Sequence, residues 1–237
     1  MTDTPPFTHD ELEPRRGVAA ETHRLSLANL RENYTRGGLN ESEIDGNPIV
    51  QFERWLQQAL AADLREPNAM TLATVTPEGK PSARIVLLKE VSESGFVFYT
   101  NYMSRKGRDL ETNPWAALIF YWADLERQVR VEGDVARVPR RQSEAYFQSR
   151  PKGSRLGAWA SRQSQPVDSR AQLEIRLKDL EARYASSDFV PTPEFWGGYV
   201  VRPQVIEFWQ GRPNRLHDRI EYRRKGETDW QIQRLSP

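Results

Sequence analysis

Four short segments of the chain pair basic side chains with aromatic or hydroxyl side chains. The first runs from Arg84 through Ile85, Val86, Leu87 and Leu88 to Lys89, so two cations bracket an apolar strand. Alternation along a strand places Arg84 and Lys89 on opposite faces, so the two charges should serve different ligand groups unless a bulge intervenes. A core strand with charged ends at the rim of a barrel is the alternative interpretation.

The second segment joins a strand end at Tyr99 and Thr100 to a helix start at Ser104, Arg105 and Lys106. Free backbone N–H groups, the helix dipole and two adjacent cations converge at such a junction, and this combination suits a phosphate monoester. Cations at a helix N-terminus are unfavourable unless an anion offsets them. A solvated Arg–Lys pair on an exposed first turn is the competing interpretation.

The third segment contains Tyr146, Arg150 and Ser154 at spacings of four. Pro151 disfavours helical geometry at Arg150, so one helix should end there and Ser154 should lie near the start of the next. A helix junction that presents a phenol, a guanidinium and a hydroxyl could bind a second phosphate. Taken alone, the pattern also fits ordinary surface residues.

The fourth segment runs from Arg215 to Arg219. If it is extended, Arg215, His217 and Arg219 share one face, while Leu216 lies on the other. A lone histidine is more often structural than functional. Burying three potential cations without an anion is costly, however, so the pattern favours an anionic ligand over a core position.

The composition excludes several classes of function. Thirty-four basic residues against thirty-three acidic ones leave a formal charge of +1, which favours neither nucleic acid nor an anionic membrane. The chain has no cysteine and only three histidines, so we expect no metal site. The first sixteen residues lack the apolar core of a secretory signal, and no apolar run approaches the roughly 20 residues of a membrane span. We expect a soluble, cytoplasmic protein.

The elements that must position these segments follow from periodicity. Residues 1–22 lack apolar anchors and predict a disordered N-terminal extension, so residues 23–237 would form a single domain. Helices are predicted around 27–36, after Asn47-Pro48, after Ser104, and over 139–148, 156–160 and 169–184. Strands are predicted over 71–76, 83–89 and 95–100 as an antiparallel meander, and over 116–122, 128–138, 198–201, 205–210, 218–223 and 230–235. This order favours a mainly β fold, a barrel or antiparallel sheet with helices packed outside.

No glycine-rich phosphate loop of either common type is present, so side chains would have to hold a cofactor phosphate. The sequence resembles the pyridoxamine 5′-phosphate oxidase family. The match is strongest over Glu207-Phe-Trp-Gln210 and Arg215-Leu-His-Asp-Arg219, and it extends to Phe98-Tyr-Thr-Asn101, Tyr146-Phe-Gln-Ser-Arg-Pro151 and Phe195-Trp-Gly-Gly198.

The resemblance implies an FMN-binding split β-barrel with peripheral helices that forms a homodimer, with FMN at the subunit interface. The residues that it implies for FMN are Arg84, Ile85, Val86, Leu87, Leu88, Lys89, Tyr99, Thr100, Arg105, Lys106, Gln128, Gln163, Ser164, Trp209 and Arg219. The residues that it implies for the substrate are Arg31, Tyr34, Lys89, Tyr146, Arg150, Ser154, Arg215, Leu216 and His217, of which Arg215 and His217 would meet the reacting pyridine ring.

The implied reaction is the oxidation of pyridoxamine or pyridoxine 5′-phosphate to pyridoxal 5′-phosphate, with hydride transfer to flavin and return of the electrons to O2. Because flavin supplies the redox chemistry, the absence of a catalytic dyad or triad agrees with it. Two alternatives stay open: another split-barrel flavin enzyme with a different substrate, and a non-catalytic carrier of FMN or pyridoxal phosphate.

Overall fold

The computed structural model describes residues 33–226 and 228–237. The predicted N-terminal extension and Arg31 lie outside the described residues, and so does most of the helix predicted around 27–36. Residues 33–36, the described part of that predicted helix, are not helical.

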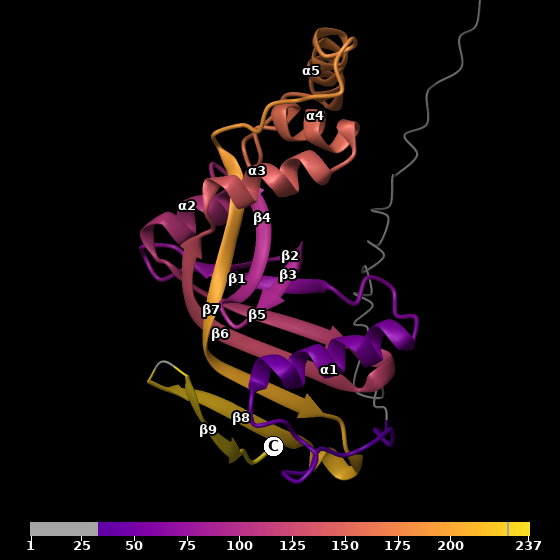
Figure 1. Cartoon of the computed structure of the whole chain (residues 1–237), viewed down its shortest axis with the longest axis vertical. Coiled ribbons are helices and arrows are strands. Elements are labelled where there is room, and N and C mark those ends of the chain that lie inside the picture. The colour runs from indigo at the N-terminus through magenta and orange to yellow at the C-terminus, as the bar shows by residue number, and fades with distance from the viewer. Residues whose placement is uncertain (1–32, 227) are drawn as a thin grey trace, which may run out of the picture. The chain divides into compact units, whose positions relative to one another are not determined.

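Five α-helices and nine strands make up the described chain (Figure 1). The helices are α1 (Pro48–Ala61), α2 (Arg105–Thr112), α3 (Arg140–Ser149), α4 (Lys152–Ala160) and α5 (Arg170–Arg183). The strands are β1 (Ala69–Val75), β2 (Pro81–Leu87), β3 (Glu90–Ser92), β4 (Gly95–Asn101), β5 (Trp115–Trp122), β6 (Arg127–Arg137), β7 (Trp196–Gln210), β8 (Asp218–Lys225) and β9 (Asp229–Arg234). The mainly β fold with peripheral helices is therefore confirmed.

The strands form one antiparallel sheet in the order β2-β1-β5-β6-β7-β4-β3, with β8 and β9 continuing from β7. The predicted meander is correct for the β1–β2 hairpin but wrong for β4, which pairs with β3 and β7 instead. The strands predicted over 198–201 and 205–210 are one long strand, β7. It passes an irregularity in its pairing with β6 at Gly133, where a Cβ would lie 2.0 Å from the carbonyl oxygen of Arg202.

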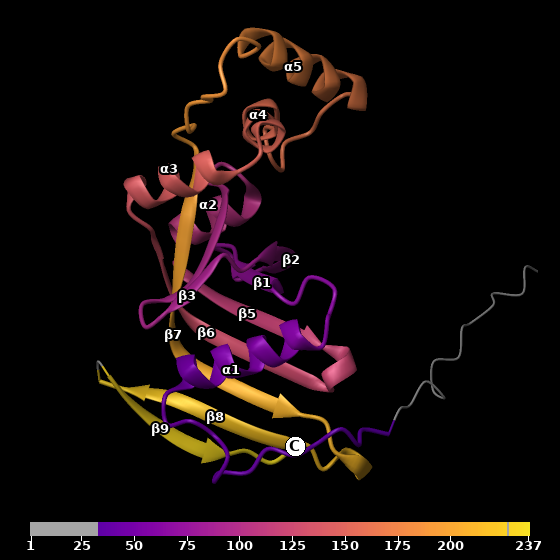
Figure 2. The ribbon, with the colours of Figure 1, turned by 45° about the vertical axis from the view of Figure 1, so that its right-hand side comes forward.

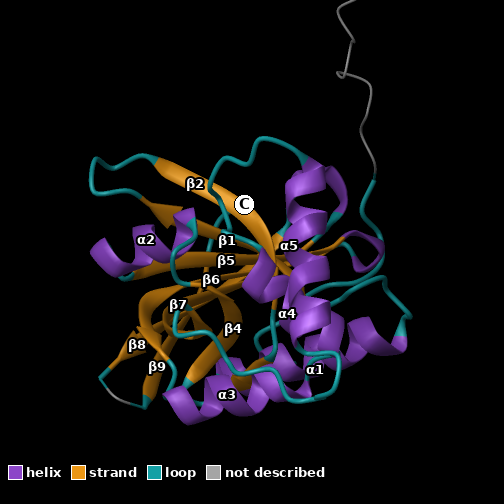
Figure 3. Cartoon of the chain, turned by 90° about the horizontal axis from the view of Figure 1, so that it is seen from above, coloured by secondary structure: helices purple, strands orange, loops and turns teal. Residues whose placement is uncertain are grey.

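Helix α1 covers the main core of the sheet. Its start is set by Asn47, whose side chain accepts a hydrogen bond from the N–H of Ile49, and by Pro48 in the first turn. Phe52 is fully buried and packs against Phe96 and Phe120, while Trp55 packs edge-on against Phe208. Figure 3 shows α1, α2 and α3 lying around the strands.

A second, smaller core lies where α3, α4 and α5 meet the beginning of β7. Phe147, Leu156, Val190 and Trp196 are buried there, and Leu177 of α5 packs against them. Figures 1 and 2 both place these three helices at one end of β7, and β8 and β9 at its other end. Within the described residues, no helix is long and apolar enough to cross a membrane.

Candidate active site

A cleft of about 630 Å³ lies between β2, β4, α2 and the junction of α3 with α4. The junction forms as the sequence predicts, because α3 ends at Ser149 and α4 begins at Lys152, after Pro151. The cleft brings together eleven of the predicted site residues: Ile85, Val86, Leu87, Lys89, Tyr99, Thr100, Lys106, Tyr146, Arg150, Ser154 and Gln163.

Lys106 lines this cleft from the first turn of α2. Its Nζ donates to Thr100 Oγ1 at 3.3 Å, to Ser104 Oγ at 3.4 Å and to Gln163 Oε1 at 3.1 Å. All three partners are neutral oxygens. Burial, followed by the nearby charge of Arg84, lowers the pKa of Lys106 to about 8. The cluster therefore holds positive charge that an anionic ligand would stabilise.

Arg84 is held in place by a network of hydrogen bonds that includes buried side chains. Its Nη1 donates to Thr74 Oγ1 at 2.7 Å and its Nη2 donates to Ser82 Oγ at 2.8 Å. Thr74 in turn donates to Asp109 of α2 at 2.7 Å, and both residues are buried. The network fixes Arg84 against the helix whose first turn carries Lys106 and the exposed Arg105.

Arg150 lines the cleft at the junction of α3 with α4. Its Nη1 is buried without a hydrogen-bond partner among the described residues, and burial lowers its pKa. The guanidinium lies 4.9 Å from the ring centroid of Trp196. The rings of Tyr99, Tyr146 and Trp196 are nearly parallel, with centroids 4.0 Å apart for Tyr99 and Tyr146, 5.5 Å for Tyr99 and Trp196, and 6.2 Å for Tyr146 and Trp196. The cleft thus has two cationic regions and an aromatic wall.

Predicted residues on β6, β7, β8 and the loop between β7 and β8 form a second group, which consists of Gln128, Trp209, Arg215, Leu216, His217 and Arg219. Leu88 belongs to neither group, because its side chain is buried in the main core. Gln128, Trp209 and Arg219 lie side by side across the three strands, so they share one face of the sheet. Arg219 donates to both carboxylate oxygens of the buried Glu207, at 2.9 and 3.0 Å. Tyr34 packs edge-on against Trp209 and His217.

The two groups lie far apart along β7. Trp196 lines the cleft and Trp209 belongs to the second group, and the strand between them could span up to roughly 40 Å. None of the described residues of the second group lines the cleft. A single chain therefore does not assemble all the predicted residues around one space.

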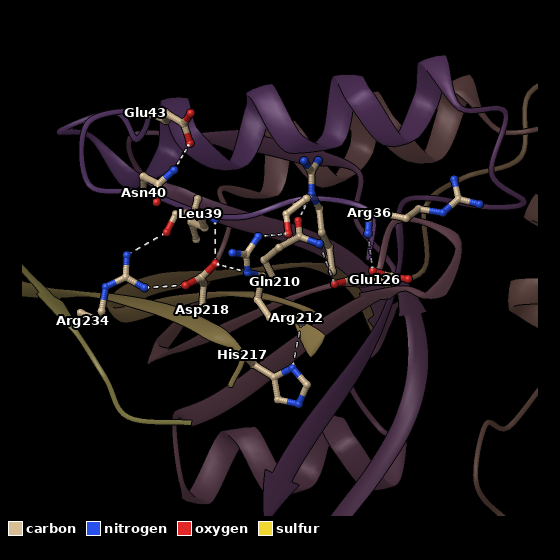
Figure 4. Close-up of polar contacts among 12 residues, drawn as sticks. Arg36, Leu39, Asn40, Glu43, Glu126, Gln210, Arg212, His217, Asp218 and Arg234 are labelled. Carbon is tan, nitrogen blue, oxygen red and sulfur yellow. Dashed lines mark hydrogen bonds and ion pairs between the residues drawn. The ribbon is translucent and has the colours of Figure 1, made fainter. Parts of the chain in front are cut away.

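His217 accepts a hydrogen bond at Nδ1 from the backbone N–H of Arg212 at 3.1 Å (Figure 4). The proton of the neutral ring is then on Nε2, which is free to donate to a ligand. Burial lowers the pKa of His217, and Arg215 lowers it further while Asp218 opposes the shift. The neutral ring is the form that predominates at neutral pH.

The extended geometry predicted from Arg215 to Arg219 is wrong at its start. Strand β8 begins only at Asp218, and Arg215 ends a short 3₁₀ turn (Pro213–Arg215) with a φ of 61°. Arg215 therefore does not share a strand face with His217. The exposed Leu216 does not lie on the opposite face of a strand either. Ser164 likewise lies in an exposed turn with a φ of 67°.

Comparison with known proteins decides the family. A family model described as pyridoxamine 5′-phosphate oxidase matches residues 56–184, and one described as the pyridoxine 5′-phosphate oxidase C-terminal dimerisation region matches residues 196–237. The chain belongs to the pyridoxamine 5′-phosphate oxidase family. The pyridoxine/pyridoxamine 5′-phosphate oxidases of Paraburkholderia phytofirmans and Rubrobacter xylanophilus are each 60% identical to it. They cover 90% and 92% of this chain, and 99% of each relative is covered.

Solved structures give the same fold. PhzG from Burkholderia lata, solved with tetrahydrophenazine-1-carboxylic acid, is 31% identical with a TM-score of 0.78, over 84% of this chain and 98% of that one. An FMN-binding, pyridoxamine 5′-phosphate oxidase-related protein from Nostoc punctiforme has a TM-score of 0.63 at 19% identity, over 78% of this chain and 97% of that one. The split-barrel architecture expected of a pyridoxamine 5′-phosphate oxidase family member is thereby confirmed.

Sequence reasoning missed two contributors to the oxidase-family site. Trp196 stacks on Tyr99 in the cleft, and the signal for it was the adjacent glycine pair. A Cβ on Gly198 would lie 2.8 Å from the ring of Tyr99. Asp109 was also missed, since an acidic residue that follows the cations of α2 gives no hint that it faces a buried threonine on β1.

Proposed function

We propose that the protein is an FMN-dependent oxidase that converts pyridoxamine or pyridoxine 5′-phosphate to pyridoxal 5′-phosphate. The observation that carries the proposal is the cleft itself, which is lined by Lys106 and Arg150, neither of which has a carboxylate partner among the described residues, and by the rings of Tyr99, Tyr146 and Trp196. Two phosphorylated planar ligands, one for each cationic region, suit this arrangement better than one ligand does. Membership in the family agrees with the proposal.

The residues of the Lys106 region fit the phosphate of FMN. Thr100, Lys106 and Gln163 already converge there, Arg84 is fixed nearby, and Arg105 occupies the first turn of α2. The predicted neighbours Ile85 to Lys89, Tyr99 and Ser164 would enclose the rest of the cofactor, and Leu88 would contribute only its backbone because its side chain is buried in the main core. Bound FMN would supply a two-electron acceptor that returns electrons to O2.

The residues of the Arg150 region fit the substrate phosphate. Lys89, Tyr146 and Ser154 line the same cleft as Arg150, and the Nη1 of Arg150, without a partner in the described chain, gives a phosphate oxygen a buried donor. Anchoring the phosphate by remote binding energy would set the position of the ring. The reaction of the amine consumes O2 and water and releases ammonia and hydrogen peroxide together with the aldehyde.

The second group would reach the cleft of a partner subunit in a homodimer. Gln128, Trp209 and Arg219 lie within or beside the part of the chain that resembles a dimerisation region. A second copy of the chain would place these residues against FMN, and Tyr34, Arg215, Leu216 and His217 against the substrate. Arg31 keeps its predicted place beside the substrate. Neither Arg215 nor His217 needs to act as an obligatory acid or base, because bound FMN would supply the redox chemistry.

Two other functions stay testable. The relation to PhzG at 31% identity allows an oxidase with another substrate, but it is weaker than the 60% relation to the two bacterial oxidases. A carrier would bind FMN without turnover. The purified protein incubated with FMN, pyridoxamine 5′-phosphate and O2 should produce pyridoxal phosphate and peroxide in equal amounts. Binding of both ligands without either product would leave only the carrier. A cytoplasmic location stays a prediction.

The homodimer proposal has a direct consequence for the cofactor. FMN retention should fall when subunits separate, since residues from two chains would hold it. Sedimentation at decreasing concentration, followed at both protein and flavin wavelengths, checks this result. A monomer that keeps one FMN per chain would contradict the interface arrangement.

The activity should have an acid limb that belongs to His217. Because its pKa is lowered, the neutral ring persists at neutral pH and is lost only as the pH falls below the ordinary value of about 6.5. Protonation of Nδ1 breaks the bond from Arg212, so kcat/KM should fall on that side and stay flat above it. His217→Asn keeps an acceptor oxygen, so we expect it to turn over without this limb. An unchanged limb in that variant would assign it to another group.

A further inference from the structure

Residues 34–41, which we call the strap, are held by polar contacts of their backbone to Glu126 and to the C-terminal part of the chain (Figure 4). The N–H of Arg36 donates to Glu126 Oε2 at 2.9 Å, and Arg212 Nη1 donates to the carbonyl of Gly37 at 2.9 Å. Backbone groups that would pair with one another in a helix are thus taken by distant partners. This explains why residues 33–36 do not continue the helix predicted from the sequence.

Leu39 is held by hydrogen bonds at both of its backbone groups and by the burial of its side chain. Its N–H donates to Asp218 Oδ2 at 3.0 Å, its carbonyl accepts from Arg234 Nη2 at 2.8 Å, and its side chain is buried in the main core. Arg234 also binds both carboxylate oxygens of Glu41, at 2.7 and 2.8 Å, and Asp218 Oδ1 at 2.7 Å. One guanidinium on β9 therefore joins the strap to β8.

Tyr34, at the other end of the strap, packs against the second group of site residues in a position that we call the seat. Its ring lies edge-on to Trp209, with centroids 5.7 Å apart, and to His217, at 5.6 Å. Gly211 forms the floor of this seat, since a Cβ there would lie 2.7 Å from Tyr34 Cγ. Only four residues separate Tyr34 from Leu39, so fixing Leu39 restricts where Tyr34 can lie.

We propose that Arg234 is a positioning residue for the oxidase reaction: by gripping Leu39 and Glu41 it holds the strap down and keeps Tyr34 seated against Trp209 and His217. The inference rests on the proposed function, because it assigns Tyr34 to the substrate side of the site. An isolated exposed ion pair contributes little to stability. Arg234, however, makes four contacts on two segments and so limits the conformational freedom of the whole strap. The pair with Arg234 lowers the pKa of Glu41 to about 2, so the grip persists through the pH range of an assay.

The first test replaces Arg234 with Gln in the full-length protein reconstituted with FMN. If the strap is released for most of the time, only a fraction of molecules presents Tyr34, so we expect KM for pyridoxamine 5′-phosphate to rise about tenfold. The maximal rate and the affinity for FMN should change less than about twofold, because saturating substrate selects the seated form. Glu41→Gln, which removes one surface partner and leaves the fold untouched, should raise KM in the same direction by less.

The control is Arg223→Gln, which removes an arginine of β8 whose ion pair with Glu221 stays within its own strand. It should keep the wild-type KM. The second test asks whether Arg234 acts through Tyr34. In a Tyr34→Ala background the Arg234→Gln change should raise KM little further, whereas independent effects would multiply. Gly211→Ala, which pushes on Tyr34 from the opposite side, should reproduce the Arg234→Gln pattern.

A readout that does not depend on turnover separates this inference from the proposed function. Arg36 is an exposed trypsin site within the strap, so cleavage after Arg36 should be faster in Arg234→Gln than in the wild type or in Arg223→Gln. Mass spectrometry of the fragment that begins at Gly37 measures the rate. A wild-type KM and cleavage rate in Arg234→Gln, or multiplied KM effects in the double variant, would overturn the positioning role. A wild-type protein that does not oxidise the substrate would overturn the proposed function instead, and the cleavage rates would still test the grip.

Discussion

Arg150→Ala should raise KM for pyridoxamine 5′-phosphate by about ten- to a hundredfold, with little loss of FMN. The reason is the buried Nη1, which has no partner in the described chain and so gives a phosphate oxygen a donor that water cannot replace. Removing a charge-assisted hydrogen bond of this kind costs about 1.5–3 kcal/mol. Steady-state kinetics with varied substrate, together with the flavin absorbance of the purified variant, measures both quantities.

Arg141→Ala is the matched control, because Arg141 lies in the first turn of α3, the helix that ends just before Arg150, and is exposed. It should leave KM unchanged. If Arg150→Ala instead loses its flavin while KM stays at the wild-type value, the two cationic regions of the cleft have been assigned in the wrong order.

Lys106→Met should weaken FMN binding by about ten- to a hundredfold and leave substrate affinity of the loaded enzyme nearly unchanged. Methionine keeps the apolar stem of the buried side chain, so the change removes the charge more than the packing. Fluorescence titration of the apoprotein with FMN gives the dissociation constant. Lys80→Met, in the exposed β1–β2 turn, is the control and should bind FMN as the wild type does.

The pH dependence of FMN affinity supplies an independent check on Lys106. Since its pKa is lowered to about 8 before the cofactor binds, the ammonium is intact below that pH and is lost above it. FMN affinity should therefore fall by up to about tenfold for each pH unit above 8, as binding must take up a proton. Lys106→Met should lack this slope. The same slope in both proteins would show that another group titrates.

The local parts of the fold could be predicted because local signals fix them. Asn47 and Ser104 cap helices as their types and positions predict, and Pro151 separates α3 from α4. The pairing of β4 with β7 could not be predicted, since strand patterns specify which face is buried but not which partner lies alongside. The non-helical structure of the strap could not be predicted for a related reason. Its backbone N–H groups form hydrogen bonds with residues more than eighty positions away in the sequence.

In the candidate site, too, the features that depend on local sequence could be predicted and those that depend on tertiary packing could not. Clusters that are contiguous in sequence, such as Thr100 with Lys106, meet in the cleft, and the resemblance added Gln163, which the structure places on Lys106. The buried support of Arg84 by Thr74 and Asp109 depends on the packing of α2 against β1, which no local pattern encodes. The turn at Arg215 was missed because Arg215 and Asn214 both adopt a left-handed φ, which residues other than glycine rarely adopt.

The most direct test of the proposed oxidase is the visible spectrum of the FMN-loaded protein mixed with pyridoxamine 5′-phosphate in the absence of oxygen. The account predicts that the yellow colour bleaches within the time of a turnover, that one pyridoxal phosphate forms per flavin, and that admitting air restores the colour with release of peroxide. A flavin that stays oxidised while the substrate is bound would contradict the account.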